Sequence, residues 1–379
     1  MGVAAVAAEA VAKVRSALTF RPLAYGYANA RVMAMRSQLV QAGMLRQMLG
    51  VGSTNEVIEL LERTAYKEDL VPLSLKFRGE ELVELALGAS FAKFAQKLRR
   101  VTPKDGEEVM AALLARYEAR NLRAVLLGRK LGRNFDDVAP FLVPAGMLTL
   151  QQLREVMEAP DAQAAYAKLR TTPFGRMIFE GSAGWMTSAQ MRSLMQGIGS
   201  TSTSEAVIGV LDAYYYHLAR GAVVRSDPER AAIADMLELE ADAKNISTLL
   251  RMKKSGAGGL EIEKMLVPGS SQEKRFWNEL AGLPGVDAVV ARAEKKFGLR
   301  EAHEKYKADG KISHFEIALE EKAARRGLKA MFRQQMSLGV LVGALLQKEQ
   351  EMGNIRKIVR GKALGLPKES IEEMLVLVE

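Results

Sequence analysis

The sequence predicts an all-helical protein built from three similar domains. Serine or threonine followed three positions later by Glu or Gln recurs before apolar stretches with helical spacing, a pattern that begins helices. One helical segment occurs three times along the chain. Alternating β-branched segments joined by Asn-Gly or Asp-Gly turns, which would indicate strands, are missing from the sequence.

The helices are expected in the following order. An alanine-rich helix over residues 3–18 precedes the first domain, and we expect it to be peripheral. Later helices are predicted to begin near five capping pairs, and each domain is predicted to end with the repeated helix and one short closing helix. The capping pairs are Ser53 with Glu56, Thr149 with Gln152, Ser202 with Glu205, Ser313 with Glu316 and Ser370 with Glu373.

The repeated segment is a helix with an asparagine in its middle, although asparagine is a poor helix former. The copies read EARNLRAVLLGRKLG, DAKNISTLLRMKKSG and EMGNIRKIVRGKALG, and they align without a gap on Asn121, Asn245 and Asn354. An acid stands three positions before the asparagine, a base eight positions after it, and a glycine suited to end the helix eleven positions after it. The acids are Glu118, Asp242 and Glu351, the bases are Arg129, Lys253 and Lys362, and the glycines are Gly132, Gly256 and Gly365.

The register of the repeat continues beyond the helix, because a Leu-Val pair follows each asparagine at the same offset. The pairs end in Val143, Val267 and Val376. The second copy follows the first by 124 residues (245 minus 121), and the third follows the second by 109 (354 minus 245). That spacing suits domains of ordinary size and is too long for a solenoid unit. We therefore expect domains over residues 1–144, 145–268 and 269–379.

The repeated acid, asparagine and base share one face of their helix, which leaves two interpretations. In the first, the polar groups join helices within each domain by satisfying one another and nearby backbone groups. In the second, the three faces converge on a pseudo-threefold axis and receive a partner, so the asparagines would lie nearer that axis than the apolar faces do. The two interpretations are compatible, and the sequence leaves both open.

Composition indicates a soluble chain. The 379 residues carry a net charge of +9 and include no cysteine, which makes a reducing compartment the default. The longest uncharged helical run, residues 334–347, is too short to span a bilayer, and we expect neither a secretory leader nor a transmembrane segment. The basic charge is compatible with acidic partners such as another subunit, anionic lipid or nucleic acid, or with a surface that maintains solubility.

Motifs of catalysis are missing from the sequence. His217, His303 and His314 fall in no metal-binding spacing, and the run that begins at Arg360 lacks the residues of a phosphate loop. The glycines that begin at Gly256 follow a helix and not a strand, so they are no dinucleotide fingerprint. We therefore expect no enzymatic activity, no cofactor, no metal and no small-molecule substrate.

A second signature lies in residues 25–39, which read YGYANARVMAMRSQL. This stretch closely resembles the N-terminal signature of the C subunit of archaeal-type (A-type, also called V/A-type) ATP synthases, relatives of the d subunit of eukaryotic V-ATPases. The signature positions are Tyr25, Tyr27, Asn29 and Arg31. The asparagine helices are similar to that family too, so the resemblance covers residues 23–379. Two features depart from the family pattern. Gly26 stands between the two tyrosines, and the N-terminal helix is long.

The resemblance implies a non-catalytic protein whose three helical domains surround a pseudo-threefold axis and form a funnel or socket. Such a socket joins the central rotor stalk, built of the D and F subunits, to the cytoplasmic face of the membrane proteolipid ring, while ATP is made or hydrolysed in the A and B subunits. The coupling ion, proton or sodium, and the direction of the motor stay open. The competing class is a basic helical nucleic-acid-binding or adaptor protein. An aromatic content of 6% and the lack of a nucleic-acid motif count against nucleic acid.

Overall fold

The computed structural model describes residues 21–180, 205–223, 228–331 and 335–377, and every regular element within them is a helix. The all-helical prediction is therefore confirmed for this part of the chain. The helix predicted over residues 3–18 and the capping serine Ser202 lie outside the described residues.

Long helices alternate with groups of short ones along the described part of the chain. The helices before the first asparagine helix are α2 (Arg21–Arg36), α3 (Ala42–Gly50), α4 (Thr54–Leu61), α5 (Lys67–Leu73) and α6 (Gly79–Val101). The next group is α7 (Lys104–Lys130), α8 (Phe135–Val138), α9 (Leu150–Met157), α10 (Ala162–Thr171), α11 (Pro173–Glu180) and α13 (Glu205–Ala222). A third group is α14 (Pro228–Lys254), α15 (Gly259–Met265), α16 (Lys274–Gly282), α17 (Gly285–Phe297), α18 (Arg300–Asp309) and α19 (Ser313–Met331). The chain ends with α20 (Leu338–Ala363) and α21 (Lys368–Met374).

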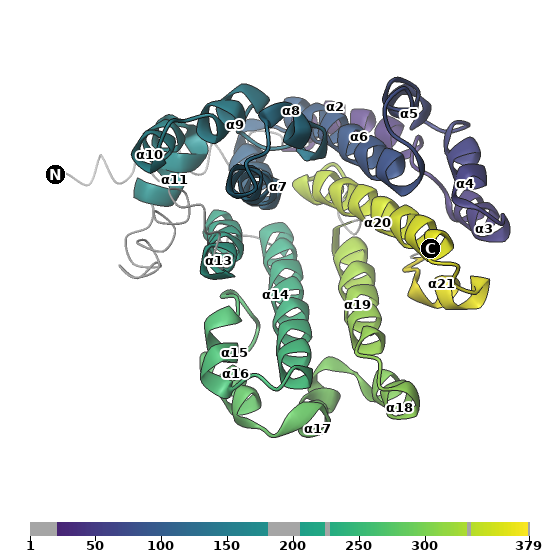
Figure 1. Ribbon diagram of the computed structural model, residues 1–379, viewed down its shortest axis with the longest axis vertical. Coiled ribbons are helices and arrows are strands. Elements are labelled where there is room, and N and C mark those ends of the chain that lie inside the picture. Colours follow the sequence, from purple (N-terminus) through teal and green to yellow (C-terminus); the bar gives the residue numbers. More distant parts are fainter. Residues whose placement is uncertain (1–20, 181–204, 224–227, 332–334, 378–379) are drawn as a thin grey trace.

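The three asparagine helices, α7, α14 and α20, each pack against a long helix of another expected domain. α7 packs against α13, α14 packs against α19, and α20 packs both against α19 and against α6 near the beginning of the chain. We call the resulting groups of helices the α7/α13 lobe, the α14/α19 lobe and the α20/α6 lobe. Figure 1 shows the short helices α15–α18 gathered at one end of the α14/α19 pair, with α8–α11 and α3–α5 on opposite sides of the other end.

The interior is apolar and is divided unevenly. One core extends from Tyr25 on α2 to Ile371 on α21 and includes buried residues of α6, α7, α13, the first part of α14 and α20. A second core lies within the α14/α19 lobe and is centred on residues such as Trp277 and Phe315. The α7/α13 and α20/α6 lobes therefore share one hydrophobic interior, to which the first part of α14 also belongs, and the α14/α19 lobe has a second interior of its own.

All three asparagine helices end in the same way. Gly132, Gly256 and Gly365 have positive φ angles of 62°, 80° and 66°, a conformation that favours glycine. In each copy the residue after the glycine donates its backbone N–H to the carbonyl five residues earlier, as in a Schellman motif. The predicted C-caps are confirmed, and each turn leads into a short closing helix, α8, α15 or α21.

The predicted capping pairs have different outcomes. Ser53 and Thr149 cap α4 and α9 with their side chains, as expected. Ser313 is the first residue of α19 and so lies just inside the helix that it was predicted to cap. The prediction at Ser370 is wrong, because α21 already begins at Lys368, directly after Pro367. Proline has a fixed φ near the helical value and lacks an N–H, so it serves as a helix start in place of the serine.

Candidate central interaction site

The three repeated asparagines make the same pair of hydrogen bonds. The side chain of Asn121 donates to the carbonyl of Val143 (2.7 Å) and accepts from the backbone N–H of the same residue (2.8 Å). Asn245 is bonded in this way to Val267 at 3.0 and 2.7 Å, and Asn354 to Val376 at 2.9 and 3.0 Å. In every copy the two partners are 22 residues apart. Each buried amide therefore fixes the segment beyond the closing helix to the middle of its asparagine helix.

The repeated acids hold the segment that leads into the next short helix. Glu118 accepts the backbone N–H groups of Met147 and Leu148, just before α9. Asp242 accepts from the backbone and hydroxyl of Ser271, just before α16. Glu351 accepts from Val40, just before α3, at 3.2 Å. The third acid thus repeats the role of the first two, but on a helix near the beginning of the chain.

Two of the repeated bases hold the other end of the same short helices. Arg129 donates to the carbonyl of Val156 (3.1 Å) in the last turn of α9. Lys362 donates to the carbonyls of Leu49 (3.0 Å) and Val51 at the end of α3. A negative group at the N-terminus of a helix and a positive group at its C-terminus both match the helix dipole. Lys253 is half-buried, and within the described residues its side chain has no hydrogen-bond partner.

Through these contacts the repeated polar groups are bonded to other parts of the same chain. Glu118, Asp242, Glu351 and the three asparagines are buried, and the three bases are half-buried. The interpretation in which they join helices is supported by every hydrogen bond described above. Contact of the same residues with a stalk stays a prediction.

The signature of α2 has a buried side and an exposed side. Tyr25 is buried and donates its hydroxyl to Asp105 (3.0 Å), while Asn29 donates to the carbonyl of Tyr25 (2.9 Å). Tyr27 and Arg31 face outward, and 69% of the Tyr27 surface is exposed. The signature therefore combines residues that attach α2 to the start of α7 with residues that are accessible from outside.

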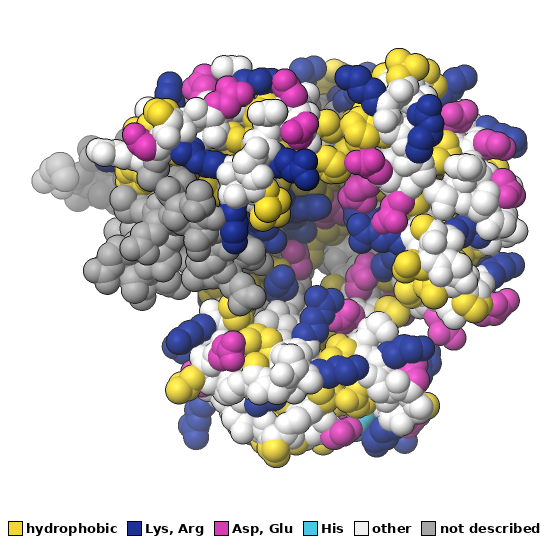
Figure 2. Space-filling model, viewed as in Figure 1, with side chains coloured by type: hydrophobic (Ala, Val, Ile, Leu, Met, Phe, Trp, Pro, Cys, Tyr) yellow, Lys and Arg dark blue, Asp and Glu magenta, His cyan; other side chains and the backbone are white. Residues whose placement is uncertain are grey.

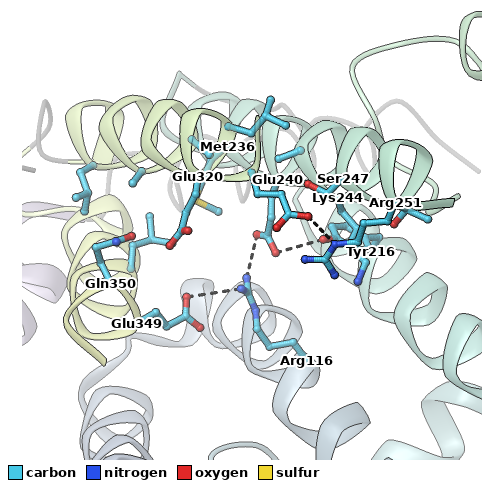
Figure 3. Close-up of a pocket in the computed structure, with 18 residues that line it drawn as sticks. Arg116, Tyr216, Met236, Glu240, Lys244, Ser247, Arg251, Glu320, Glu349 and Gln350 are labelled. Atoms are coloured by element: carbon cyan, nitrogen blue, oxygen red, sulfur yellow. Dashed lines mark hydrogen bonds and ion pairs between the residues drawn. The ribbon is translucent and has the colours of Figure 1, made fainter. Parts of the chain in front are cut away.

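A different set of repeated positions meets where the three asparagine helices approach one another. Arg116, Glu240 and Glu349 each stand five positions before the asparagine of their repeat. Arg116 lies 3.1 Å from a carboxylate oxygen of Glu240 and 3.6 Å from one of Glu349 (Figure 3). Five residues turn a helix by about 140°, so this central triad lies on nearly the opposite side of each helix from the asparagine. The asparagine faces are therefore not the ones that meet.

The central triad is a charged cluster with one base and two acids. Burial lowers the pKa of Arg116, but the carboxylates of Glu240 and Glu349 more than offset this, and the pKa lies well above its ordinary value. Burial raises the pKa of Glu349, although Arg116 and the hydroxyl of Tyr117, which donates to Glu349 at 2.8 Å, both oppose the shift. Arg116 also donates to the hydroxyl of Tyr215 on α13 and lies over its ring. The triad connects all three lobes.

A pocket of about 540 Å³ lies beside the triad, between α14, α19 and α20. Figure 2 shows a hollow between the α14/α19 lobe and the rest of the molecule, with basic and acidic side chains around the opening. Charged groups from every side line the pocket (Figure 3). They are Glu240, Glu316, Glu320, Glu349, Arg116, Lys244 and Arg251. Such a lining suits a polar segment of a protein partner better than an apolar small molecule.

The histidines take structural positions. His303 is buried with Nδ1 3.3 Å from Glu294, and His314 lies 2.9 Å from Asp309, while His217 is exposed. No group of three or more His, Cys, Asp or Glu side chains within the described residues is arranged to hold a metal ion. Nor is any described helix both long and apolar enough to cross a membrane.

The central triad is not among the residues expected from the sequence, although the repeat contains a signal for it. The column five positions before the asparagine contains Arg, Glu and Glu, and so offers one base to two acids. The repeat is evident from aligned positions at which all three copies have the same kind of residue. At this position the charge differs between the copies. Complementary charges in a column of an internal repeat are a signal that the copies meet there.

The fold and the site define a class, an all-helical protein whose internal repeats are joined around a central polar site. The chain belongs to the family described as ATP synthase (C/AC39) subunit, whose model matches residues 28–374. This confirms the resemblance seen in residues 25–39.

The individual relatives are consistent with that family. The chain is similar to the C subunit of the A-type ATP synthase of Methanocaldococcus jannaschii, with 23% identity over 360 residues that cover 93% of this chain and 86% of the relative. It is also similar to the C subunit of the A-type ATP synthase of Pyrococcus abyssi, with 27% identity over 356 residues that cover 93% and 90%. The protein of the same description from Thermococcus kodakarensis is 26% identical over 354 residues, which cover 93% of this chain and 90% of the relative.

Proposed function

We propose that this protein is a non-catalytic subunit of a rotary A/V-type ATP synthase or ATPase. In this role it forms the socket that joins the rotor stalk, made of the D and F subunits, to the proteolipid ring, and it is peripheral on the cytoplasmic side of the membrane. The family match over residues 28–374 is the observation that carries the proposal.

The arrangement of the lobes supports a socket with pseudo-threefold symmetry. The same position of three repeats meets in the central triad. α7 pairs with α13, α14 with α19 and α20 with α6, and α20 also packs against α19. We infer that the sequence repeats bounded near residues 144 and 268 are the related units, and that each lobe combines the asparagine helix of one unit with the long helix of the next. A central site formed by all three units is suited to receive the end of a stalk.

The contacts between lobes also support a mechanical role. A coupling subunit has to transmit torque, so its lobes must resist displacement relative to one another. Arg116 on α7 is bonded to α13, α14 and α20 at the same time. Because charged and hydrogen-bonded contacts are directional, a cluster that joins four helices resists sliding more than an apolar contact of similar size does.

Co-purification tests the proposed function. The full chain carrying an affinity tag would be produced together with the D and F stalk subunits and, in detergent, with the proteolipid ring. We expect the stalk and the ring to elute with the tagged chain in fixed proportion, and a tagged unrelated helical protein to retain neither. Absence of both partners would contradict the proposal. Salt-dependent retention of random duplex DNA at physiological ionic strength would instead favour the nucleic-acid-binding class.

A further inference from the structure

The α14/α19 and α20/α6 lobes contain an equivalent ion pair, which shows that the two long helices of each lobe are aligned in the same way. Six positions after its asparagine, α14 has Arg251, which lies 2.5 Å from Glu316 on α19. At the same position α20 has Arg360, which lies 2.8 Å from Glu80 on α6. Glu316 and Glu80 are therefore equivalent in the two lobes. One helical turn further along α19 and α6, Glu320 and Glu84 are equivalent as well.

The residues that face these two acids differ. In the α20/α6 lobe, Arg356 forms a two-bonded pair with Glu84, with distances of 2.6 and 2.7 Å. Arg356 stands two positions after its asparagine, and the equivalent residue of α14 is Ser247. The α14/α19 lobe thus keeps the acid, Glu320, but has a short hydroxyl side chain where the other lobe has the arginine.

The pocket beside the central triad lies where α14 has Ser247 in place of the arginine. Both Ser247 and Glu320 line it, as Figure 3 shows. Glu320 is bonded to Lys357 of α20 at 2.8 Å, yet 42% of its side chain remains exposed. Carboxylates of Glu240, Glu316 and Glu349 lie around the same space. Of the bases that line it, Arg116 and Arg251 are already shared with these acids, and Lys244 is exposed. The volume of about 540 Å³ therefore contains a carboxylate that can accept a further donor.

We propose that this pocket receives an arginine side chain from the end of the rotor stalk, in the place that Arg356 fills in the α20/α6 lobe. The inference rests on the proposed function, because the stalk is the partner of the socket. Arginine is favoured over lysine because its planar guanidinium bonds both oxygens of one carboxylate, as Arg356 does with Glu84. The other two lobes contribute Arg116, Glu349 and Lys357 to the surroundings of the pocket, so its position is central.

The substitution Ser247→Arg tests the proposal by supplying the missing arginine from within the chain. We expect it to pair with Glu320 and to block the pocket, so that affinity for the isolated stalk falls at least tenfold while helicity and melting temperature are kept. Ser255→Arg is the matched control, because it adds the same side chain at an exposed position at the end of α14. Loss of stalk affinity with Ser247→Arg and not with Ser255→Arg would support the proposal, and equal affinity in both would overturn it.

A double-mutant cycle identifies the arginine and guards against an indirect effect. Each arginine at the end of the stalk would be changed to alanine and measured against the wild-type chain and against Glu320→Gln. We expect one stalk arginine whose loss weakens binding to the wild-type chain but has little further effect with Glu320→Gln. Additive losses for every stalk arginine would overturn the inference. If the wild-type chain bound no stalk at all, the proposed function would fail first and the inference would fail with it.

Discussion

A nitrogen of the Arg116 guanidinium lies 3.1 Å from a carboxylate oxygen of Glu240, although the two residues occupy the same position in successive copies of one repeat. Their separation of 124 residues equals the distance between the copies. Identical charges at three equivalent positions around a centre would repel one another. The repeats have therefore diverged where they meet, and Glu349 completes the cluster as its third member.

Removal of the central base should destabilise the protein. The substitution Arg116→Met leaves the carboxylates of Glu240 and Glu349 close together and without their shared partner. We expect a loss of about 1–3 kcal/mol in the free energy of unfolding at neutral pH, because the half-buried carboxylates lose their shared partner but stay partly solvated. Urea denaturation followed by circular dichroism measures the loss.

The same cluster provides its own control. A triple variant with Arg116→Met, Glu240→Gln and Glu349→Leu removes every charge and should recover much of the stability lost by Arg116→Met alone. Equal stability of the single and triple variants would show that the charges do not act on one another.

The repeated asparagines should each be important for stability, and Asn245 is fully buried. Asn245→Ala removes two hydrogen bonds and leaves the N–H and carbonyl of Val267 without their partner. We expect a loss of about 2–4 kcal/mol in the free energy of unfolding, since each unsatisfied buried backbone group costs roughly 1–3 kcal/mol. Thermal and urea unfolding would measure it, with Ser255→Ala as a surface control. A loss below about 0.5 kcal/mol, the range of surface substitutions, would contradict the assigned role.

Two glycines of α20 should respond to alanine in opposite ways. A Cβ added at Gly361 would lie 2.5 Å from Ile371 of the closing helix α21, whereas one at Gly353 would meet nothing within 4 Å. We expect Gly361→Ala to destabilise by about 1–3 kcal/mol through overpacking. Gly353→Ala should stabilise by roughly 0.5–1 kcal/mol, because glycine is unfavourable inside a helix. Melting temperatures that shift in the same direction for both variants would refute this account of the closing helix.

Glu118 should make the stability of the protein depend on pH. Burial raises its pKa to about 7, while hydrogen bonding by the backbone of Leu148 opposes the shift. Since the unfolded carboxyl titrates near about 4.3, the folded state binds the proton more tightly, and stability falls as the pH rises between these values. We expect this group to remove about 2–3 kcal/mol between pH 5 and pH 8.

The comparison with Glu118→Gln isolates that contribution, because the amide cannot ionise. The stability of the wild-type chain should fall more steeply from pH 5 to pH 8 than that of the variant. Asp242 and Glu351, whose pKa values are also raised by burial, remain in both proteins and affect both profiles alike. Parallel profiles would show that Glu118 does not titrate in this range.

Local features of the fold could be predicted from the sequence. The asparagine helices and their glycine ends follow from short-range patterns, and the structure has them as expected. The constant offset of the Leu-Val pairs was also visible, and the valine proved to be the bonding partner of the asparagine. The hydrogen bond itself could not be predicted, because it depends on the fold of the closing segment between the two residues.

Contacts between distant segments could not be predicted in the same way. Nothing in the periodicity of α6 or α20 indicates that these two helices pack together, because many amphipathic helices are compatible with one another. Nothing in the helical pattern of the repeat indicates that Arg129 and Lys362 hold the ends of short helices, whose bonded carbonyls lie 27 and 313 residues away. Opposite charges at one aligned position of the repeat indicate that the three copies meet there. They do not indicate which long helices pack together.

The pairing of α6 with α20 affects how the protein folds during its synthesis. Helices α2–α6 emerge early from the ribosome, but the helix that covers their apolar side is among the last to be translated. Domains generally fold as units once their parts are available, and exposed apolar surface invites aggregation in the meantime. The N-terminal segment therefore cannot complete its packing before α20 is made, and chains that stop before Leu338 should leave the face of α6 that packs against α20 uncovered. Such truncated chains would be expected substrates of chaperones and proteases, whereas the α14/α19 lobe, with its separate core, can form as soon as α19 has been made.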